Sequence, residues 1–147
     1  SDVYKRQVLE DKYVYIFDEL RPLINLLKKK GFKIKFEIPP KKGVYGLFQN
    51  KSKTLWISPI TFELGIGRQT ILHEATHAAQ SCPNKQLATI GYEFSTSPFI
   101  KNEIQAHIIR NYDINQYILE KEAFSLQGNK NGVNLLLKAI NERCNDL

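Results

Sequence analysis

The chain has 147 residues, of which 42% are apolar and 11% aromatic, and its formal net charge is +6. This composition is typical of one globular domain and excludes a disordered chain. No apolar run is long enough to span a bilayer, and the lysines are spread along the sequence without a nucleic-acid-binding motif. We therefore expect a single domain with no membrane span and no nucleic-acid partner.

The first seven residues, Ser-Asp-Val-Tyr-Lys-Arg-Gln, match the translation of a transposon-end adapter used to prepare DNA sequencing libraries. We interpret residues 1–7 as a non-native segment, and the gene as an environmental sequence fragment. The domain is then expected to comprise residues 8–147, and a signal peptide upstream would be missing from the sequence.

Residues 8–30 predict one long helix, because apolar residues recur there at intervals of three and four. Pro22 falls within it and indicates a kink or a division into two helices, and Gly31 marks its end. The expected apolar face comprises Val14, Phe17, Leu20, Leu23, Ile24 and Leu27.

Three short strands are expected next. Strict alternation over residues 32–38 predicts a half-buried strand that ends at Pro39-Pro40. Residues 43–49 and 53–59 predict two more strands, joined by a polar turn at 50–52. We expect the three strands to pair as a small antiparallel sheet, with Trp56 in the core. The apolar face of the first strand is expected to comprise Phe32, Ile34, Phe36 and Ile38.

The second half of the chain is expected to be mainly helical. A helix is predicted from about Thr61 to Ser81, ended by Pro83 and followed by a loop or hairpin over residues 84–97. Helical spacing returns over residues 98–111, 114–127 and 133–144, with a turn before the last of these. The order of one helix, three strands and four helices indicates an α+β domain.

The stretch from Thr70 to Cys82 contains His73, Glu74 and His77 in the pattern H-E-x-x-H. Histidines four residues apart lie on one face of a helix, so both imidazoles can bind one zinc ion. Glu74 is rotated away from that pair, and its carboxylate can take a proton from a water on the metal. Chance alone would place the pattern in about 0.4% of chains of this composition. We expect a zinc site, with an ordinary amphipathic helix as the alternative.

A catalytic zinc site needs a third protein ligand and one open position. Gln80 and Pro83 stand where the longer H-E-x-x-H-x-x-G-x-x-H pattern has glycine and histidine, so we expect a downstream acid instead. The candidates are Glu103, 26 residues after the second histidine, and Glu120 or Glu122. Glu103 and Glu120 each precede an alanine by three residues, a spacing that lets a helix approach the metal closely. The residues alone leave the choice open.

The segments His73–Cys82, Glu120–Gln127 and Val133–Cys144 resemble gluzincin-type metallopeptidases of cyanobacteria and marine phages. Those proteins have H-E-x-x-H-x-x-Q-x-C, then E-x-E-A, and a final helix that ends in cysteine; the match covers about residues 43–144. The E-x-E-A segment is also similar to the third-ligand helix of ImmA/IrrE-type peptidases, although Phe124 stands where that family has asparagine. The resemblance implies a minimal zincin-like fold with Zn²⁺ as cofactor and Glu120 as third ligand, ahead of Glu103 and then Glu122.

These observations predict a zinc metallopeptidase that hydrolyses peptide bonds with metal-activated water, Glu74 acting as general base. The alternative is a non-catalytic zinc-binding or interaction module in which the metal is structural. His107 is expected either to bond to Glu103 or to serve as a partner of a metal ligand or an oxyanion donor. Three tyrosines are further candidates for the oxyanion donor: Tyr92, Tyr112 and Tyr117.

The two cysteines allow two interpretations. Cys82 directly follows the histidine-bearing helix and Cys144 lies near the end of the chain, so they are either buried thiols or one disulfide that joins the last helix to that helix. A disulfide would close a loop of roughly 60 residues, contribute on the order of 3–4 kcal/mol, and favour an extracytoplasmic or secreted location.

Overall fold

The computed structural model describes residues 2–92, 102 and 114–145, which form six helices and a three-stranded mixed sheet. The α+β class expected from the sequence is confirmed. The elements in chain order are α1 (Asp2–Lys12), α2 (Val14–Lys29), β1 (Lys33–Lys35), β2 (Gly46–Gln49), β3 (Thr54–Ile57), α3 (Ile60–Glu63), α4 (Gly67–Gln80), α6 (Ile114–Gln127) and α7 (Gly132–Arg143).

The predicted first helix is divided at Tyr13, not at Pro22. Tyr13 leaves helical geometry (φ −118°, ψ 53°), and its ring packs against Phe62 with the centroids 5.4 Å apart. Pro22 lies exposed inside α2, which continues through it. Val14, expected on the apolar face, is 47% exposed, because the core-facing stripe begins one turn later. The buried stripe comprises Phe17, Leu20, Leu23, Ile24 and Leu27.

The sheet has the order β1-β3-β2, with β1 parallel and β2 antiparallel to β3. The expectation of a wholly antiparallel sheet was therefore wrong for β1. Ten residues connect β1 to β2, and Pro39-Pro40 within them prevent a tight hairpin. The connection carries the chain past one strand position, which β3 then fills.

Trp56 and Ile38 do not lie in the core as expected. Side chains alternate between the faces of a strand, so Leu55 and Ile57, both fully buried, place Trp56 on the opposite face. Trp56 is half-buried there, with the Lys35 ammonium 5.9 Å from its ring centroid. Ile38 is 81% exposed because β1 ends three residues earlier and the chain leaves the sheet.

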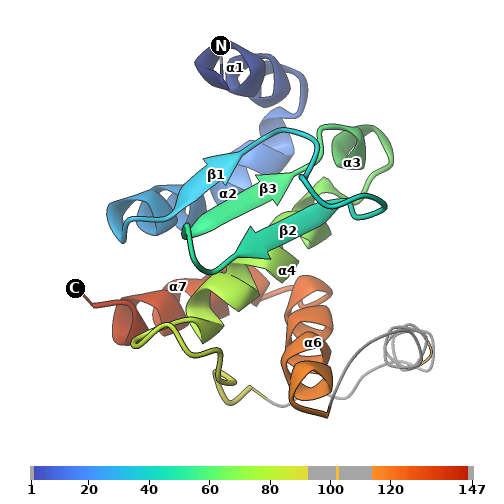
Figure 1. Cartoon of the computed structure of the whole chain (residues 1–147). Coiled ribbons are helices and arrows are strands. Elements are labelled where there is room, and N and C mark those ends of the chain that lie inside the picture. Colours follow the sequence, from blue (N-terminus) through green and yellow to red (C-terminus); the bar gives the residue numbers. More distant parts are fainter. Residues whose placement is uncertain (1, 93–101, 103–113, 146–147) are drawn as a thin grey trace.

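Helix α4 occupies the centre of the structure, behind the sheet and against α7 and α6 (Figure 1). It contacts α2, α3, β2, β3, α6 and α7. The predicted helix over residues 61–81 is divided into α3 and α4 because Gly65 adopts φ +76°, a conformation that ends a helix. Small side chains at Ala75, Ala78 and Ala79, each fully buried, allow the neighbouring elements to approach α4 on several sides.

Helices α6 and α7 lie close to their predicted bounds, whereas the helix predicted over residues 98–111 falls outside the described residues. Cys82, just after α4, forms a disulfide with Cys144, just after α7. Of the two interpretations of the cysteines, the structure has the disulfide. Within the described part of the chain, no helix is long and apolar enough to cross a bilayer.

We expect the disulfide to contribute substantially to stability, since it closes a loop with a sequence separation of 62 residues. Replacing both Cys82 and Cys144 with serine should lower the free energy of unfolding by about 3–4 kcal/mol, because the unfolded chain gains entropy. Urea unfolding with and without a reductant measures this. The reductant should destabilise only the wild type; an unchanged wild-type midpoint would contradict the prediction.

Candidate metal centre

His73 and His77 lie one turn apart on the face of α4 that meets α6. Their side chains are only 14% and 12% exposed, and their rings pack edge to face with centroids 4.9 Å apart. The helix therefore presents both imidazoles to the same point in space, as the four-residue spacing predicts.

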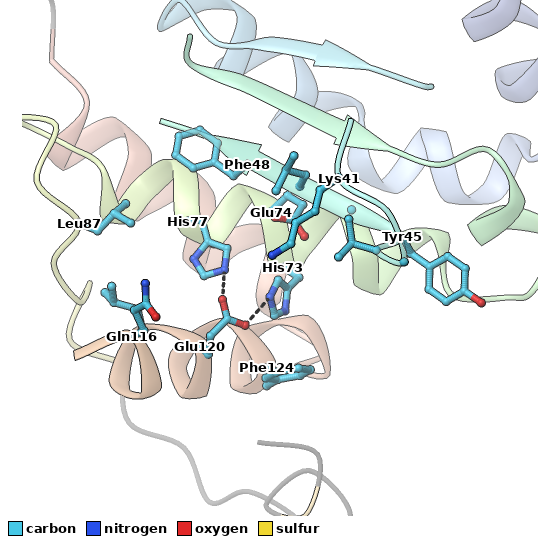
Figure 2. Close-up of a pocket in the computed structure, with 15 residues that line it drawn as sticks. Lys41, Tyr45, Phe48, His73, Glu74, His77, Leu87, Gln116, Glu120 and Phe124 are labelled. Atoms are coloured by element: carbon cyan, nitrogen blue, oxygen red, sulfur yellow. Dashed lines mark hydrogen bonds and ion pairs between the residues drawn. The ribbon is translucent and has the colours of Figure 1, made fainter. Parts of the chain in front are cut away.

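Glu120 of α6 bridges the two imidazoles (Figure 2). Its Oε1 lies 2.7 Å from Nε2 of His77 and its Oε2 lies 3.1 Å from Nε2 of His73. One ligand atom from each of these residues lies within 4.8 Å of the other two. Ligands bound at about 2.0 Å in a tetrahedral zinc site lie roughly 3.3 Å apart, so small shifts would let an ion replace the shared protons. The three residues can hold a metal ion.

The side chains of α6 that contact the two histidines lie on one face of that helix. Glu120, Phe124 and Gln127 are spaced by four and three residues and so lie along a single stripe of the helix. The Phe124 ring packs edge-on against His73, with centroids 4.8 Å apart. Ala123 is fully buried, and its small side chain lets α6 approach α4 closely, as the E-x-x-A spacing predicts.

Glu120 and His77 form a charged pair. Burial by itself would raise the pKa of Glu120, but the hydrogen bonds to His73 and His77 and their charges outweigh it and hold that pKa well below its usual range. Burial by itself would lower the pKa of His77, but the hydrogen bond to Glu120, with the charges of Glu120 and Glu74, raises it to about 9. An imidazolium–carboxylate pair thus compensates the buried charges in the metal-free protein.

Two glutamines orient the imidazoles from behind. Nδ1 of His73 lies 2.8 Å from Oε1 of Gln127, and Nδ1 of His77 lies 2.8 Å from Oε1 of Gln80. An amide oxygen only accepts, so each contact is a hydrogen bond in the tautomer whose Nδ1 carries the proton. Each Nε2 is then directed toward Glu120 and is the atom available to a metal.

Glu74 lies beside the ligands but does not belong to the group of three. It is 7% exposed and accepts a hydrogen bond from the backbone N–H of Phe48 in β2. Burial raises the pKa of Glu74, and the charges of His73 and His77 only partly oppose this. A carboxylate poised in this way can accept a proton near neutral pH more readily than an exposed one.

Gly46 allows β2 to approach Glu74. A Cβ at this position would lie 2.8 Å from Oε2 of Glu74 and 2.7 Å from Cγ2 of Thr70. Both separations are below any normal contact, so a larger residue would displace the side chains of Glu74 and Thr70 or move the strand away.

A pocket of about 380 Å³ opens on these residues between β2, α4 and α6 (Figure 2). Besides the polar trio and Glu74, its walls are largely apolar, and Lys41 extends its side chain into it. Such a volume is within the usual range for a ligand pocket. The apolar side chains of the wall are Val44, Leu47, Phe48, Leu87, Leu119 and Phe124.

The other predicted site residues either lie away from the three candidate ligands or fall outside the described residues. Glu122 faces away from the metal group and bonds to Gln80 and to backbone N–H groups at residues 90–92. Tyr92 donates its hydroxyl to the carbonyl of Leu135, and neither it nor Tyr117 lines the pocket. The remaining candidates lie outside the described residues: Glu103, His107 and Tyr112.

Sequence reasoning missed Gln127 and Gly46, and saw Gln80 only as part of the motif. A signal for Gln127 was present, because it lies seven residues after Glu120 and hence two turns along the same face. Gly46 gave no signal, because a close approach between β2 and α4 is a tertiary contact.

We expect Glu120 to be required for metal binding. Replacing it with alanine removes one of three ligands and leaves two adjacent imidazoles, so zinc content should fall from about one ion per chain to well below half. Elemental analysis of identically purified proteins measures this, and Glu142→Ala, an exposed acid on α7, is the control. Full zinc in the Glu120→Ala protein would exclude this residue as a ligand.

Gly46→Ala is expected to destabilise the fold by about 1–3 kcal/mol, because the added methyl group overpacks the contact with Glu74. Gly128→Ala is the matched control, since a Cβ there meets no atom within 4 Å. Denaturant unfolding of both variants measures the difference. Equal stabilities would show that β2 and α4 separate at little cost.

Comparisons with known proteins give no family for the chain: no protein-family model, no curated protein and no solved structure matches it. The assignment of the site therefore rests on the side chains of α4 and α6 and their contacts.

Proposed function

We propose that this chain is a zinc-dependent peptidase in which His73, His77 and Glu120 bind the metal and Glu74 is the general base. One observation carries the proposal. Two imidazole Nε2 atoms and a carboxylate converge on one point at the wall of a pocket, with a second, buried carboxylate beside them. A separate acid for proton transfer is what a hydrolytic site needs in addition to its ligands.

The donor set favours zinc. Two neutral imidazoles and one carboxylate are a ligand combination of catalytic zinc sites, which keep a fourth position open. When bound, zinc would lower the pKa of a water toward about 7 and polarise a carbonyl group. Gln80 and Gln127 support this use, because they direct both Nε2 atoms at the same point.

Glu74 would move the protons. Its carboxylate is held by the Phe48 N–H and bounded by Gly46, so it has little freedom to turn away. It would accept a proton from the attacking water and then donate that proton to the leaving amine. The raised pKa of Glu74 favours the first step, since a stronger base accepts the proton more readily. The second step requires only that the protonated carboxyl be a stronger acid than the ammonium group of the leaving amine.

An extended peptide is the substrate that the pocket suits. β2 is an edge strand, and Gly46, Leu47 and Phe48 line the pocket, so a peptide could pair beside it. The segment 53–59, also considered as a pairing edge, is unsuited because β3 lies between two strands. The resemblance of the sequence to gluzincin-type and ImmA/IrrE-type peptidases agrees with a peptide substrate. The disulfide is compatible with an extracytoplasmic location, which belongs to the proposal.

A structural zinc module is the second candidate. A structural site is normally closed by four protein ligands, and the ligand group found among the described residues has three. That group also opens on a pocket, which a structural ion does not need. His107, the candidate for a fourth ligand, lies outside the described residues.

Glu74→Gln separates the two candidates. The amide keeps the shape of the side chain but cannot accept the proton, so we expect zinc content to stay near one per chain and peptide hydrolysis to fall about a hundredfold or more. Cleavage of an unstructured protein substrate, followed by mass spectrometry, measures the activity. Glu63→Gln, an exposed acid on α3, is the control. Undiminished hydrolysis in Glu74→Gln would refute the proposed mechanism.

A further inference from the structure

Glu122 is a buried carboxylate that the proposed reaction does not use. It is 5% exposed, and it accepts hydrogen bonds from the backbone N–H groups of Ile90 (2.7 Å), Gly91 (2.9 Å) and Tyr92 (3.2 Å). A fourth hydrogen bond comes from Nε2 of Gln80, at 3.0 Å. These four donors compensate the charge of Glu122 and fix its position.

Glu122 thereby determines which way the amide of Gln80 faces. Nε2 of Gln80 donates to Oε1 of Glu122 and to the carbonyl of Leu119, at 3.0 Å and 3.1 Å. Both groups only accept, so the amide nitrogen must lie on their side and the amide oxygen must face His77. The oxygen lies 2.8 Å from Nδ1 of His77 and accepts its proton. A chain of hydrogen bonds thus runs from Glu122 through Gln80 to a metal ligand.

The segment of residues 83–92, called here the wall segment, is held at several other points. The guanidinium of Arg143 donates to the carbonyls of Ala88 and Thr89 in this segment, at 3.2 and 2.9 Å. It also donates to the carbonyl of Cys82, just before the segment, at 2.9 Å. Leu87 of this segment lines the pocket. The wall segment therefore joins the pocket surface to the donors that fix Glu122.

We infer that Glu122 is a positioning residue that couples the wall segment to the metal ligand His77. By fixing Gln80 it keeps Nδ1 of His77 protonated and Nε2 free for the metal, and the N–H groups of residues 90–92 keep Glu122 in place. This inference rests on the metal site of the proposed function. Coupling of this kind is reciprocal: order in the wall segment strengthens metal binding, and metal binding orders the wall segment.

Glu122→Gln tests the coupling directly. In either orientation the NH2 group of the introduced amide faces N–H donors, either those of Gln80 and Ile90 or those of Gly91 and Tyr92. One link between the wall segment and His77 is therefore lost, and the hold on Gln80 is weakened toward the single acceptor at Leu119. Zinc affinity, measured by competition with a chelator, should fall about ten- to hundredfold. Glu142→Gln should leave it unchanged. Wild-type affinity in a folded Glu122→Gln protein would overturn the inference.

A second substitution distinguishes positioning from a merely structural role. Gln80→Leu removes the acceptor for Nδ1 of His77 and should lower zinc affinity by itself. If Glu122 acts through Gln80, the double variant Glu122→Gln/Gln80→Leu should bind zinc about as tightly as Gln80→Leu alone. Losses that simply add in the double variant would show that Glu122 acts through general stability and not through Gln80.

Hydrogen exchange of the wild-type protein tests the coupling without any substitution. The amides of Ile90, Gly91 and Tyr92 should exchange more slowly once zinc is bound, and unchanged rates would overturn the coupling. A protein that binds zinc but hydrolyses nothing would remove the proposed activity and leave this inference standing. If the wild type binds no zinc, the part of the inference that concerns the metal fails with the proposed function. NMR of the metal-free protein then tests the positioning part: the Nδ1 proton of His77 should exchange faster in Glu122→Gln than in the wild type, and equal rates would refute it.

Discussion

The structure depends on hydrogen-bond and charge partners for the polar side chains of α4, a helix that is buried on most of its sides. Helix α4 carries His73, Glu74 and His77 into the interior, where an unpaired polar or charged group costs several kcal/mol. Helix α6 supplies most of the compensation, because Glu120 meets both imidazoles and Gln127 meets one of them from behind. The contact between the two helices is therefore set by hydrogen bonds as well as by apolar packing.

The sheet provides the partner for the third buried polar residue of this motif, Glu74, from the other side of α4. Glu74 cannot share the partners of the imidazoles, because it lies on a different part of the helix surface. β2 provides a backbone N–H for it at Phe48, and the absence of a side chain at Gly46 lets the strand come near enough. The strand that forms the edge of the sheet is thus also the strand that fixes the proposed base, which places any peptide paired with β2 next to Glu74.

The sequence predicted those parts of the structure that local patterns encode. The buried stripe of α2 followed from its spacing, and the convergence of His73 and His77 followed from the helix turn. It did not predict that β1 pairs in parallel with β3, because strand order depends on where a ten-residue connection crosses the sheet. The first helix breaks at Tyr13, whose ring packs against Phe62, 49 residues away along the chain. Contacts distant in sequence leave no periodic signal.

The choice between Glu120 and Glu122 could have been narrowed from helix geometry. Residues two apart on a helix point about 200° away from each other, so the two carboxylates of E-x-E cannot both reach one ion held by another helix. The structure divides their roles accordingly: Glu120 faces the imidazoles, and Glu122 faces Gln80 and the wall segment. Alanine at position 123 lies between these directions and lets α6 come close enough for both. Under the proposed function, the E-x-E-A pattern meets two requirements at once: Glu120 is a metal ligand on one side of the helix, and Glu122 on the other side holds Gln80 against His77. A single ligand would require only the first glutamate.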